Sequence, residues 1–345
     1  MGSTRQPLAW FGGVLATGLD LVTDDPAALD RGGWWAVVQT FEGALTAARF
    51  TDVREAPLPA APWVGVRRDA WTSSMSEHGY RAAVEKIRGQ IADGEVYQAN
   101  LCRVLSAPLP DGADLLGLAG LLDTGNPAPY AGAVVLPEHG VQVATASPEL
   151  YLSRDGPVVE SGPIKGTGRT AADLTEKDRA ENVMIADLVR NDLGAVAVAG
   201  SVTVPALCAV EPHPGLVHLV SRVRAQLRPG AGWADLLAAT FPPGSVSGAP
   251  KSSALRIIGD LEPGPRGPYC GAVGWVDADR HTAALAVGIR TFWADGGALH
   301  FGTGAGITWG SDPALEWAET ELKAEHLLAV AAGTWPATDE GEEIE

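Results

Sequence analysis

The stretch that decides the fold is 298–323, which reads ALHFGTGAGITWGSDPALEWAETELK. Its first residues predict a strand over 298–301, and the glycine run 302–306 ends that strand. Backbone without side chains lets amide N–H groups approach an anion closely, so the run can serve as an anion cradle. It is a poor dinucleotide-binding fingerprint, because it reads GxGxG and no regular βαβ unit surrounds it.

Three long helices are predicted from their capping signals. The last should begin with Ser311 as its N-cap and end before Gly333. An earlier helix follows the capping-box pattern at 74–77 and continues to 93–94. A third helix covers about 175–193.

The final helix carries charge on one face. Glu316, Glu319 and Lys323 are spaced i, i+3 and i+7, so their side chains share that face. The opposite side should pack on the core through four apolar residues: Leu315, Ala318, Leu322 and Leu328. A solvated stripe with an internal salt bridge is the plain alternative for the charged face.

Strands make up most of the remaining pattern. They are expected at 34–41, 45–50, 96–105, 131–136, 201–204, 217–227, 271–276 and 283–292. Strands interrupted by a few long helices favour an α+β fold over a regular βαβ alternation. We interpret 1–335 as one domain and 336–345 as an acidic tail.

Composition narrows the function classes. The 345 residues carry a formal charge of −17, which argues against a nucleic-acid surface. An anionic substrate would therefore need a local cationic spot on an acidic protein. No apolar run is long enough for a membrane span, and residues 1–7 lack a secretory core. Three cysteines without a CxxC pair suggest reduced thiols, so we expect a cytoplasmic protein.

Two carboxylate pairs on separate helices are candidate metal ligands. Asp178 and Glu181 are spaced i, i+3, as are Glu316 and Glu319. Carboxylates that converge from two helices suit Mg²⁺, which takes a few protein oxygens and leaves positions for substrate. No His/Cys cluster argues for zinc. Spacing alone leaves both a metal site and a charged surface open.

Two lysines lie among glycine and proline. Lys165 belongs to SGPIKGTGR at 161–169, and Lys251 to GSVSGAPK at 244–251. A loop lysine is usually solvated, which is one interpretation of Lys165. The other is an amine near a divalent cation, whose like charge lowers the pKa so that the neutral amine can attack. The stretch at 244–251 does not have the spacing of a Walker loop.

Eleven short motifs carry a family resemblance. In chain order they are YQANL (97–101), SPE (147–149), PIKGT (163–167), AEN (180–182), RNDLG (190–194), HLVS (218–221), GAPK (248–251), RGPY (266–269), IRT (289–291), GAG (304–306) and EWAET (316–320). In these motifs and their order, from about 76 to 330, the chain resembles the chorismate-utilising family of anthranilate, aminodeoxychorismate, isochorismate and salicylate synthases. The resemblance implies a large layered α/β sandwich with extensive antiparallel sheets.

The resemblance also implies a site. Glu181 and Glu319 would hold Mg²⁺, with Asp178 and Glu316 assisting, and the metal would bind a carboxylate of chorismate. Arg290, Lys323 and the amides of Gly304, Ala305 and Gly306 would hold the remaining anionic groups, with Tyr269 beside them. Further implied substrate contacts are Thr167, Ser247 and Thr291.

Two positions point to one branch of the family. Isochorismate and salicylate synthases have a lysine base where this chain has Gln98, and glutamine cannot deprotonate water. Anthranilate synthases typically have alanine where this chain has Lys165, whereas aminodeoxychorismate synthases have lysine. That lysine is thought to attack C2 of the ring before ammonia adds at C4. Glu149 resembles the general acid for the C4 hydroxyl, and His218, a further candidate, does not discriminate.

The leading expectation is therefore Mg²⁺-dependent amination of chorismate at C4, as in aminodeoxychorismate synthases. Ammonia addition at C2, giving anthranilate or 2-amino-2-deoxyisochorismate, is the alternative reaction. A chorismate-binding protein without turnover is an alternative of another class. Because no cysteine lies in a GxCxG loop, ammonia should come from solution or a separate glutamine amidotransferase subunit.

Some positions depart from the family pattern. Gly168, Asp178, Pro243 and Ser247 stand where proline, glutamate, glycine and threonine are common. The chain also begins late relative to longer relatives, which have an N-terminal segment that helps form a tryptophan pocket. We therefore expect no tryptophan feedback, and inhibition by submillimolar tryptophan would refute this.

Overall fold

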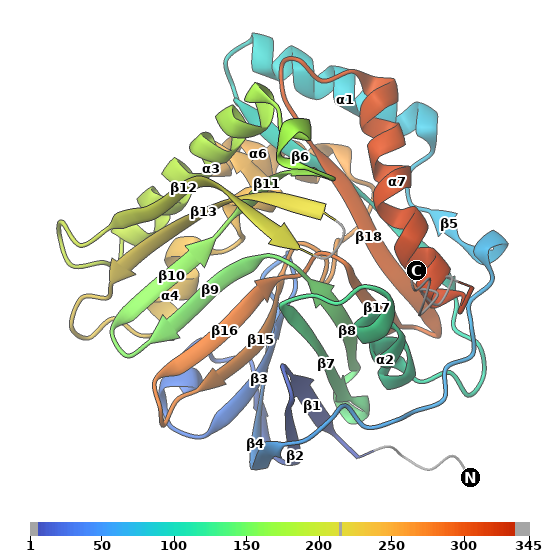
Figure 1. Cartoon of the computed structure of the whole chain (residues 1–345), viewed down its shortest axis with the longest axis vertical. Helices are drawn as coiled ribbons and strands as arrows, with labels where there is room; N and C mark the ends of the chain where they lie inside the picture. The colour runs from blue at the N-terminus through green and yellow to red at the C-terminus, as the bar shows by residue number, and fades with distance from the viewer. Residues whose placement is uncertain (1–5, 214–215, 335–345) are drawn as a thin grey trace, which may run out of the picture.

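The computed structural model describes residues 6–213 and 216–334. Its eighteen strands belong to one large curled sheet, in which paired neighbours run antiparallel. Long helices cover its outer side in Figure 1. The predicted α+β class is therefore confirmed. The acidic tail at 336–345 lies outside the described residues.

The strands in chain order are β1 Leu8–Phe11, β2 Val14–Thr23, β3 Trp34–Gln39, β4 Leu45–Glu55, β5 Thr72–Ser73, β6 Gln98–Pro108, β7 Tyr130–Leu136, β8 Val141–Ser147, β9 Leu150–Asp155, β10 Val158–Gly162, β11 Ile164–Gly168, β12 Thr203–His213, β13 Leu216–Gln226, β14 Gly248–Ala249, β15 Ala272–Asp277, β16 Thr282–Val287, β17 Thr291–Asp295 and β18 Ala298–Ile307. The helices are α1 Glu77–Ala92, α2 Leu115–Gly125, α3 Glu176–Gly194, α4 Trp233–Thr240, α5 Gly244–Ser247, α6 Lys251–Leu261 and α7 Pro313–Ala331.

Three apolar clusters hold these elements together. The largest joins the β-strands to α3 and α4 around Trp35 and Trp233. A second packs α2 and α7 on the sheet around Phe292. The third lies between α1, β6 and α6 and includes Tyr80 and Ile257. Each fully buried side chain of this size contributes about 1.5–3 kcal/mol, so the clusters fix how α3 and α7 are placed.

Capping signals located the long helices well. The N-cap of α1 is Ser76, whose hydroxyl accepts from the Gly79 amide. The capping box predicted at 74–77 is therefore wrong by two residues, although it lies at the start of the helix. Thr175 and Asp178 form a complete capping box at the start of α3. The cap of α7 was predicted wrongly. Asp312 accepts from the first amides of α7, because the Ser311 hydroxyl is engaged by the Thr308 amide.

Two strand predictions also need correction. The strand predicted at 298–301 continues through the glycine run to Ile307, because β6 pairs with it along its whole length. The strand predicted at 283–292 is divided into β16 and β17. The break falls at Arg290, whose φ of +50° is incompatible with a continuous strand. The strand predicted at 201–204 begins two residues later, as β12, and runs on to His213.

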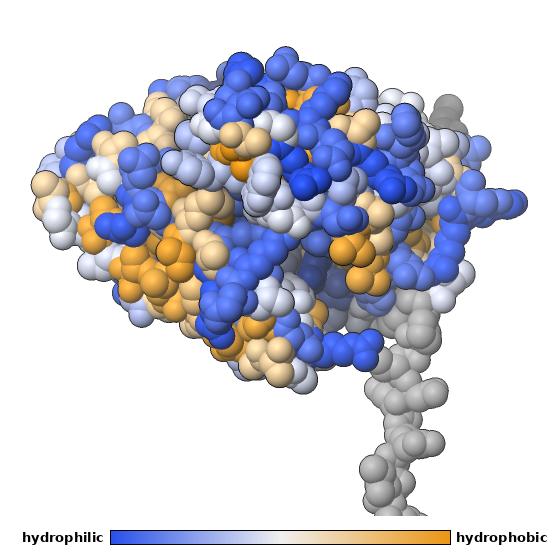
Figure 2. Space-filling model, turned by 90° about the horizontal axis from the view of Figure 1, so that it is seen from above, coloured by the Kyte–Doolittle hydropathy of each residue, from blue (hydrophilic) through white to orange (hydrophobic). Residues whose placement is uncertain are grey.

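The apolar face expected on α7 is wrong for three of its four residues, and Leu328 alone of the four packs against the core. Leu315 and Leu322 are 71% and 70% exposed, and Ala318 is exposed as well. The buried face instead carries small and polar residues such as Thr320 and Ala324. These small side chains let α7 lie close to α1 and β18, so tertiary packing overrides the apolar pattern. From the side where these helices lie, the surface is mostly hydrophilic with separate apolar patches (Figure 2).

Within the described residues, no helix combines the length and apolar character that crossing a bilayer requires.

Candidate active site

Lys165 on β11 is the centre of the candidate site. Its ammonium donates a 2.8 Å hydrogen bond to the backbone carbonyl of Ser245 on α5. Burial lowers the pKa of Lys165, and the nearby Lys323 ammonium lowers it further. Three carboxylates oppose this shift: Glu181, Glu149 and Glu319. The predicted residues from α3, α7 and the turn after β8 therefore gather around this amine, and burial is a larger cause than like charge.

Gln98 lies against both Lys165 and the glycine run. Its buried amide donates a 3.5 Å hydrogen bond to a carboxylate oxygen of Glu181. A Cβ atom at Gly306 would lie 2.1 Å from the Gln98 amide nitrogen and 3.7 Å from the Lys165 ammonium. Glycine is thus needed here because side chains from β6 and β11 approach the β18 backbone closely.

The rest of the glycine run, 302–305, lies next to the contacts of Gly306 on the same strand. Its β18 backbone pairs with β6 throughout, whereas β17 pairs only with 298–301. The Lys323 ammonium donates to the Gly304 carbonyl at 3.1 Å. The ring of Tyr269 lies against Gly302, and the Tyr269 hydroxyl is 3.9 Å from the Cys102 sulfur. The roles of the amides and of Tyr269 toward an anion stay predictions.

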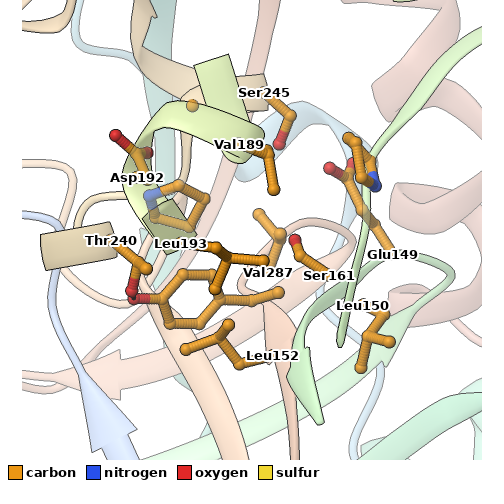
Figure 3. A pocket seen from close by; sticks show the side chains of 14 residues that line it. Glu149, Leu150, Leu152, Ser161, Val189, Asp192, Leu193, Thr240, Ser245 and Val287 are labelled. Carbon is orange, nitrogen blue, oxygen red and sulfur yellow. Dashed lines mark hydrogen bonds between the residues drawn. The ribbon is translucent and has the colours of Figure 1, made fainter. Parts of the chain in front are cut away.

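Glu149 is the buried acid of the site. It lies in the turn between β8 and β9 and is 4% exposed. Burial raises the pKa of its carboxyl group to about 7, against the lowering influence of Ser245 and Lys165. Among the described residues, its Oε1 atom has no hydrogen-bond partner. Figure 3 shows this carboxyl group facing a cavity together with the Ser245 side chain. A carboxyl group that is partly protonated near neutral pH can act as a general acid.

The ammonium group of one lysine lies between the predicted carboxylates of α3 and α7. The Lys177 ammonium lies 3.8 Å from Glu181 and 3.7 Å from Glu316. Burial raises the pKa of both carboxyl groups, and their mutual repulsion adds to the shift in Glu181. Glu319 pairs with Lys323 at 2.6 Å. A cation is therefore already stabilised between the two helices.

The carboxylates of α3 and α7 have the donor atoms that suit a magnesium ion, but they are not arranged as a complete set of ligands. Carboxylate oxygens are the ligands that Mg²⁺ prefers. Within the described residues, however, no three metal-ligating side chains form a ready cluster. Asp178 accepts hydrogen bonds from the amide and hydroxyl of Thr175 as the third residue of α3 in its capping box. Its assisting role toward a metal stays a prediction.

Arg290 supplies a candidate anion contact. Burial lowers the pKa of its guanidinium group, and no carboxylate of the described residues forms an ion pair with it. A half-buried cation without a counter-ion is favourably placed for an anionic ligand. The next residue, Thr291, is fully buried, and its hydroxyl bonds with Thr145 at 2.8 Å and the Ile289 carbonyl at 3.0 Å.

The remaining predicted residues lie at the edges of the site. The Thr167 hydroxyl is 2.8 Å from Nδ1 of the buried His218, on the neighbouring strand β13. The Ser247 hydroxyl is fully buried and donates to the Pro243 carbonyl at 3.0 Å. Catalytic or substrate contacts of these three side chains stay predictions.

Sequence reasoning missed two residues at the centre. Lys177 precedes Glu181 by four positions, a spacing that predicts an ion pair on a helix. That signal could have been used, although it would not have shown that Glu316 lies on the other side. Ser245 belongs to the quoted stretch 244–251, but its contact with Lys165 spans 80 residues. No local pattern could have found it.

Known proteins show a consistent similarity. A family model described as chorismate binding enzyme matches residues 38–329. Anthranilate synthase component 1 of Streptomyces coelicolor is 40% identical over 284 residues, covering 79% of this chain and 55% of that protein. Aminodeoxychorismate synthase component 1 of Bacillus subtilis is 38% identical over 267 residues, covering 74% and 56%.

The chain thus spans little more than half the length of these two relatives. Among solved structures, anthranilate synthase component I from Streptococcus pneumoniae aligns with a TM-score of 0.76 at 23% identity. The alignment covers 95% of this chain and 93% of that one, and it shows a shared fold.

Proposed function

Because the chain belongs to the family of chorismate binding enzymes, we propose that it aminates chorismate at C4 with ammonia, giving 4-amino-4-deoxychorismate. The observation that carries the proposal is the half-buried amine of Lys165, held 2.8 Å from the Ser245 carbonyl and near the candidate acid and metal ligands. Lysine at this position is typical of aminodeoxychorismate synthases, whereas alanine is typical of the C2-aminating anthranilate synthases.

The proposed reaction uses Lys165 and Glu149 together. The neutral amine of Lys165 attacks C2, and Glu149 gives its proton to the C4 hydroxyl, which leaves as water. Ammonia then bonds to C4, the bond between C2 and the lysine nitrogen breaks, and the Glu149 carboxylate takes up the proton that ammonia releases. One chorismate and one ammonia give one aminated product and one water. The lowered pKa of Lys165 and the raised pKa of Glu149 both favour the required protonation states.

Gln98 supports ammonia over water as the nucleophile. Its amide cannot take a proton from water, and it is held between Glu181 and Gly306. Neutral ammonia needs no such base.

We propose Mg²⁺ as the cofactor, held by Glu181 and Glu319 with Glu316 and Asp178 assisting. When bound, the ion would neutralise a carboxylate of chorismate. Arg290 and Lys323 would hold the other anionic groups of the substrate. These few focused cations explain how a protein with a charge of −17 captures an anion.

The ammonia source is proposed to be a separate glutamine amidotransferase subunit. Both relatives are named component 1, which implies a partner component. The product would then feed p-aminobenzoate and folate synthesis.

Product analysis tests the proposal. The chain is incubated with chorismate, Mg²⁺ and ammonium, with and without glutamine and a glutaminase, and products are identified by mass spectrometry. We expect a C4-aminated product that Lys165→Ala abolishes, while Lys86→Ala, at an exposed lysine on α1, leaves it unchanged. Anthranilate formed equally by the wild type and Lys165→Ala would overturn the proposal. No consumption of chorismate would instead favour a binding protein without turnover.

A further inference from the structure

Ser245 faces both candidate catalytic groups with different atoms. Its backbone carbonyl accepts the 2.8 Å hydrogen bond from Lys165. Its side chain points toward the Glu149 carboxyl group across the edge of the cavity in Figure 3. We propose that Ser245 is a positioning residue, which fixes the amine of Lys165 relative to the acid of Glu149 and stabilises the carboxylate that Glu149 becomes. This inference rests on the proposed function.

The turn that carries Ser245 is a rigid support. All four residues of α5 are buried. The Val246 carbonyl accepts a 2.8 Å hydrogen bond from the buried guanidinium of Arg266, and the Ser247 hydroxyl donates to the Pro243 carbonyl. A Cβ atom at Gly244 would lie 2.6 Å from the Leu188 side chain, so α5 packs tightly on α3. A serine on such a turn can hold its partners without moving itself.

Several other polar groups at the cavity already have partners, whereas Ser161 lines it alongside Ser245. The Lys165 ammonium on β11 lies close enough to Glu149 to lower the pKa of its carboxyl group. Asp192 on α3 is paired with Lys251, and Tyr151 on β9 hydrogen-bonds to Thr240 at 2.6 Å. Among the groups that lower the pKa of Glu149, the Ser245 side chain has the largest effect, ahead of the Lys165 ammonium and the Ile164 amide.

The two contacts of Ser245 have separable chemical consequences. The carbonyl bond to Lys165 survives any side-chain substitution. The hydroxyl points toward the Glu149 carboxyl group, favours its ionised form and so lowers its pKa against the effect of burial. When Glu149 gives its proton to the leaving hydroxyl, the same hydroxyl stabilises the new carboxylate. Removing it should slow the proton transfer, raise the pKa of Glu149 and leave chorismate binding intact.

The test compares Ser245→Ala with two other variants. Ser245→Thr keeps the hydroxyl, and Ser252→Ala removes an exposed hydroxyl from the adjacent helix α6. We expect Ser245→Ala to lower kcat about ten- to hundredfold with an unchanged KM for chorismate, as for loss of one hydrogen bond to a charged group. The alkaline limb of the kcat profile should move to higher pH. Ser245→Thr should recover most of kcat, and Ser252→Ala should match the wild type.

Several results would overturn the inference. These are an unchanged kcat for Ser245→Ala, a lower kcat with no shift of the alkaline limb, or a failure of Ser245→Thr to recover activity. The pKa of Glu149 is also measured directly, by carbon NMR of labelled carboxyl groups assigned with Glu149→Gln. That readout needs no turnover, so it separates failure of this inference from failure of the proposed reaction. Should Ser245→Ala not fold, Ser245→Cys, a weak donor, replaces it.

Discussion

The Lys251 ammonium lies 2.7 Å from a carboxylate oxygen of Asp192, with only 17% and 10% of the two side chains exposed. The pair ties α6 to the end of α3, and Lys251 also donates to the Thr240 carbonyl at 2.9 Å. Lys251→Met would leave the Asp192 carboxylate buried and unpaired. We expect the free energy of unfolding at pH 7 to fall by about 2–3 kcal/mol, less than for a fully buried pair because some solvent reaches it.

Urea denaturation measures this loss. The matched control is Asp187→Asn, which breaks an exposed ion pair with Arg190 on the same helix. That variant should change the unfolding free energy by less than about 0.5 kcal/mol. Equal effects of the two variants would show that the Lys251 pair has no special structural role.

Glu149→Gln removes the proposed acid without removing its volume. We expect kcat to fall about 10²- to 10⁴-fold, because an amide cannot protonate the leaving hydroxyl. In the wild type, activity that depends on protonated Glu149 should fall as the pH rises through about 7, the pKa of this group. Steady-state rates from pH 5.5 to 9 check both. If the residual activity of Glu149→Gln falls over the same alkaline pH range as the wild type, another group causes that fall.

The same substitution has a consequence for stability. The folded pKa of Glu149 is about 7 and the ordinary value is 4.5, so the native state keeps a proton that the unfolded chain releases. Glu149 contributes about 3 kcal/mol to the free energy of unfolding below about pH 4.5. This contribution is lost as the pH rises through about 7. Glu149→Gln should therefore be increasingly more stable than the wild type between pH 5 and 8.

Urea denaturation at both pH values measures this difference. Glu138→Gln, at an exposed position, is the control and should give the same difference at each pH. A pH-independent difference for Glu149→Gln would mean that the native carboxyl group ionises as readily as in water.

Local signals predicted the three long helices and pointed to four candidate carboxylates, but not to how those carboxylates are arranged. The Ser76 cap of α1 and the capping box at Thr175 each join residues three positions apart, so the sequence shows such signals directly. Which side of α7 is buried depends instead on its fit to α1 and β18. That fit buries Glu316 and exposes Leu322, against the apolar pattern.

Long-range contacts explain the other failures. The cation between Glu181 and Glu316 comes from Lys177, and it is defined only once α3 and α7 are in place. The hydrogen bond from Lys165 to the Ser245 backbone carbonyl leaves no pattern in the sequence, because every residue has a backbone carbonyl. The family motifs suggested the candidate site residues, and the fold supplies the distances between them.

Gly306→Ala tests the close contact between β18 and the site. The added methyl group would lie 2.1 Å from the Gln98 amide nitrogen, so Gln98 must move away from Glu181. We expect kcat/KM to fall at least tenfold, about 1.4 kcal/mol, because displacing a positioned group by a fraction of an ångström is enough for such a loss. Gly310→Ala, where nothing lies within 4 Å, should keep wild-type activity. Equal activities would place Gln98 outside the reacting geometry.

Lys177 competes with any cation that Glu181 and Glu316 bind. Its ammonium lies 3.8 Å and 3.7 Å from these carboxylates, so Mg²⁺ must displace it. Lys177→Met removes the competing charge while keeping an unbranched side chain of similar length. It should tighten Mg²⁺ binding about two- to fivefold, as for a partly exposed ion pair of about 0.4–1 kcal/mol. Calorimetric titration of Mg²⁺ without substrate measures this, and Lys86→Met is the control at an exposed position. Glu181→Gln should weaken binding in the same titration. Unaltered affinity in both site variants would place the metal elsewhere, since neither the removed competitor nor the removed ligand would then contact it.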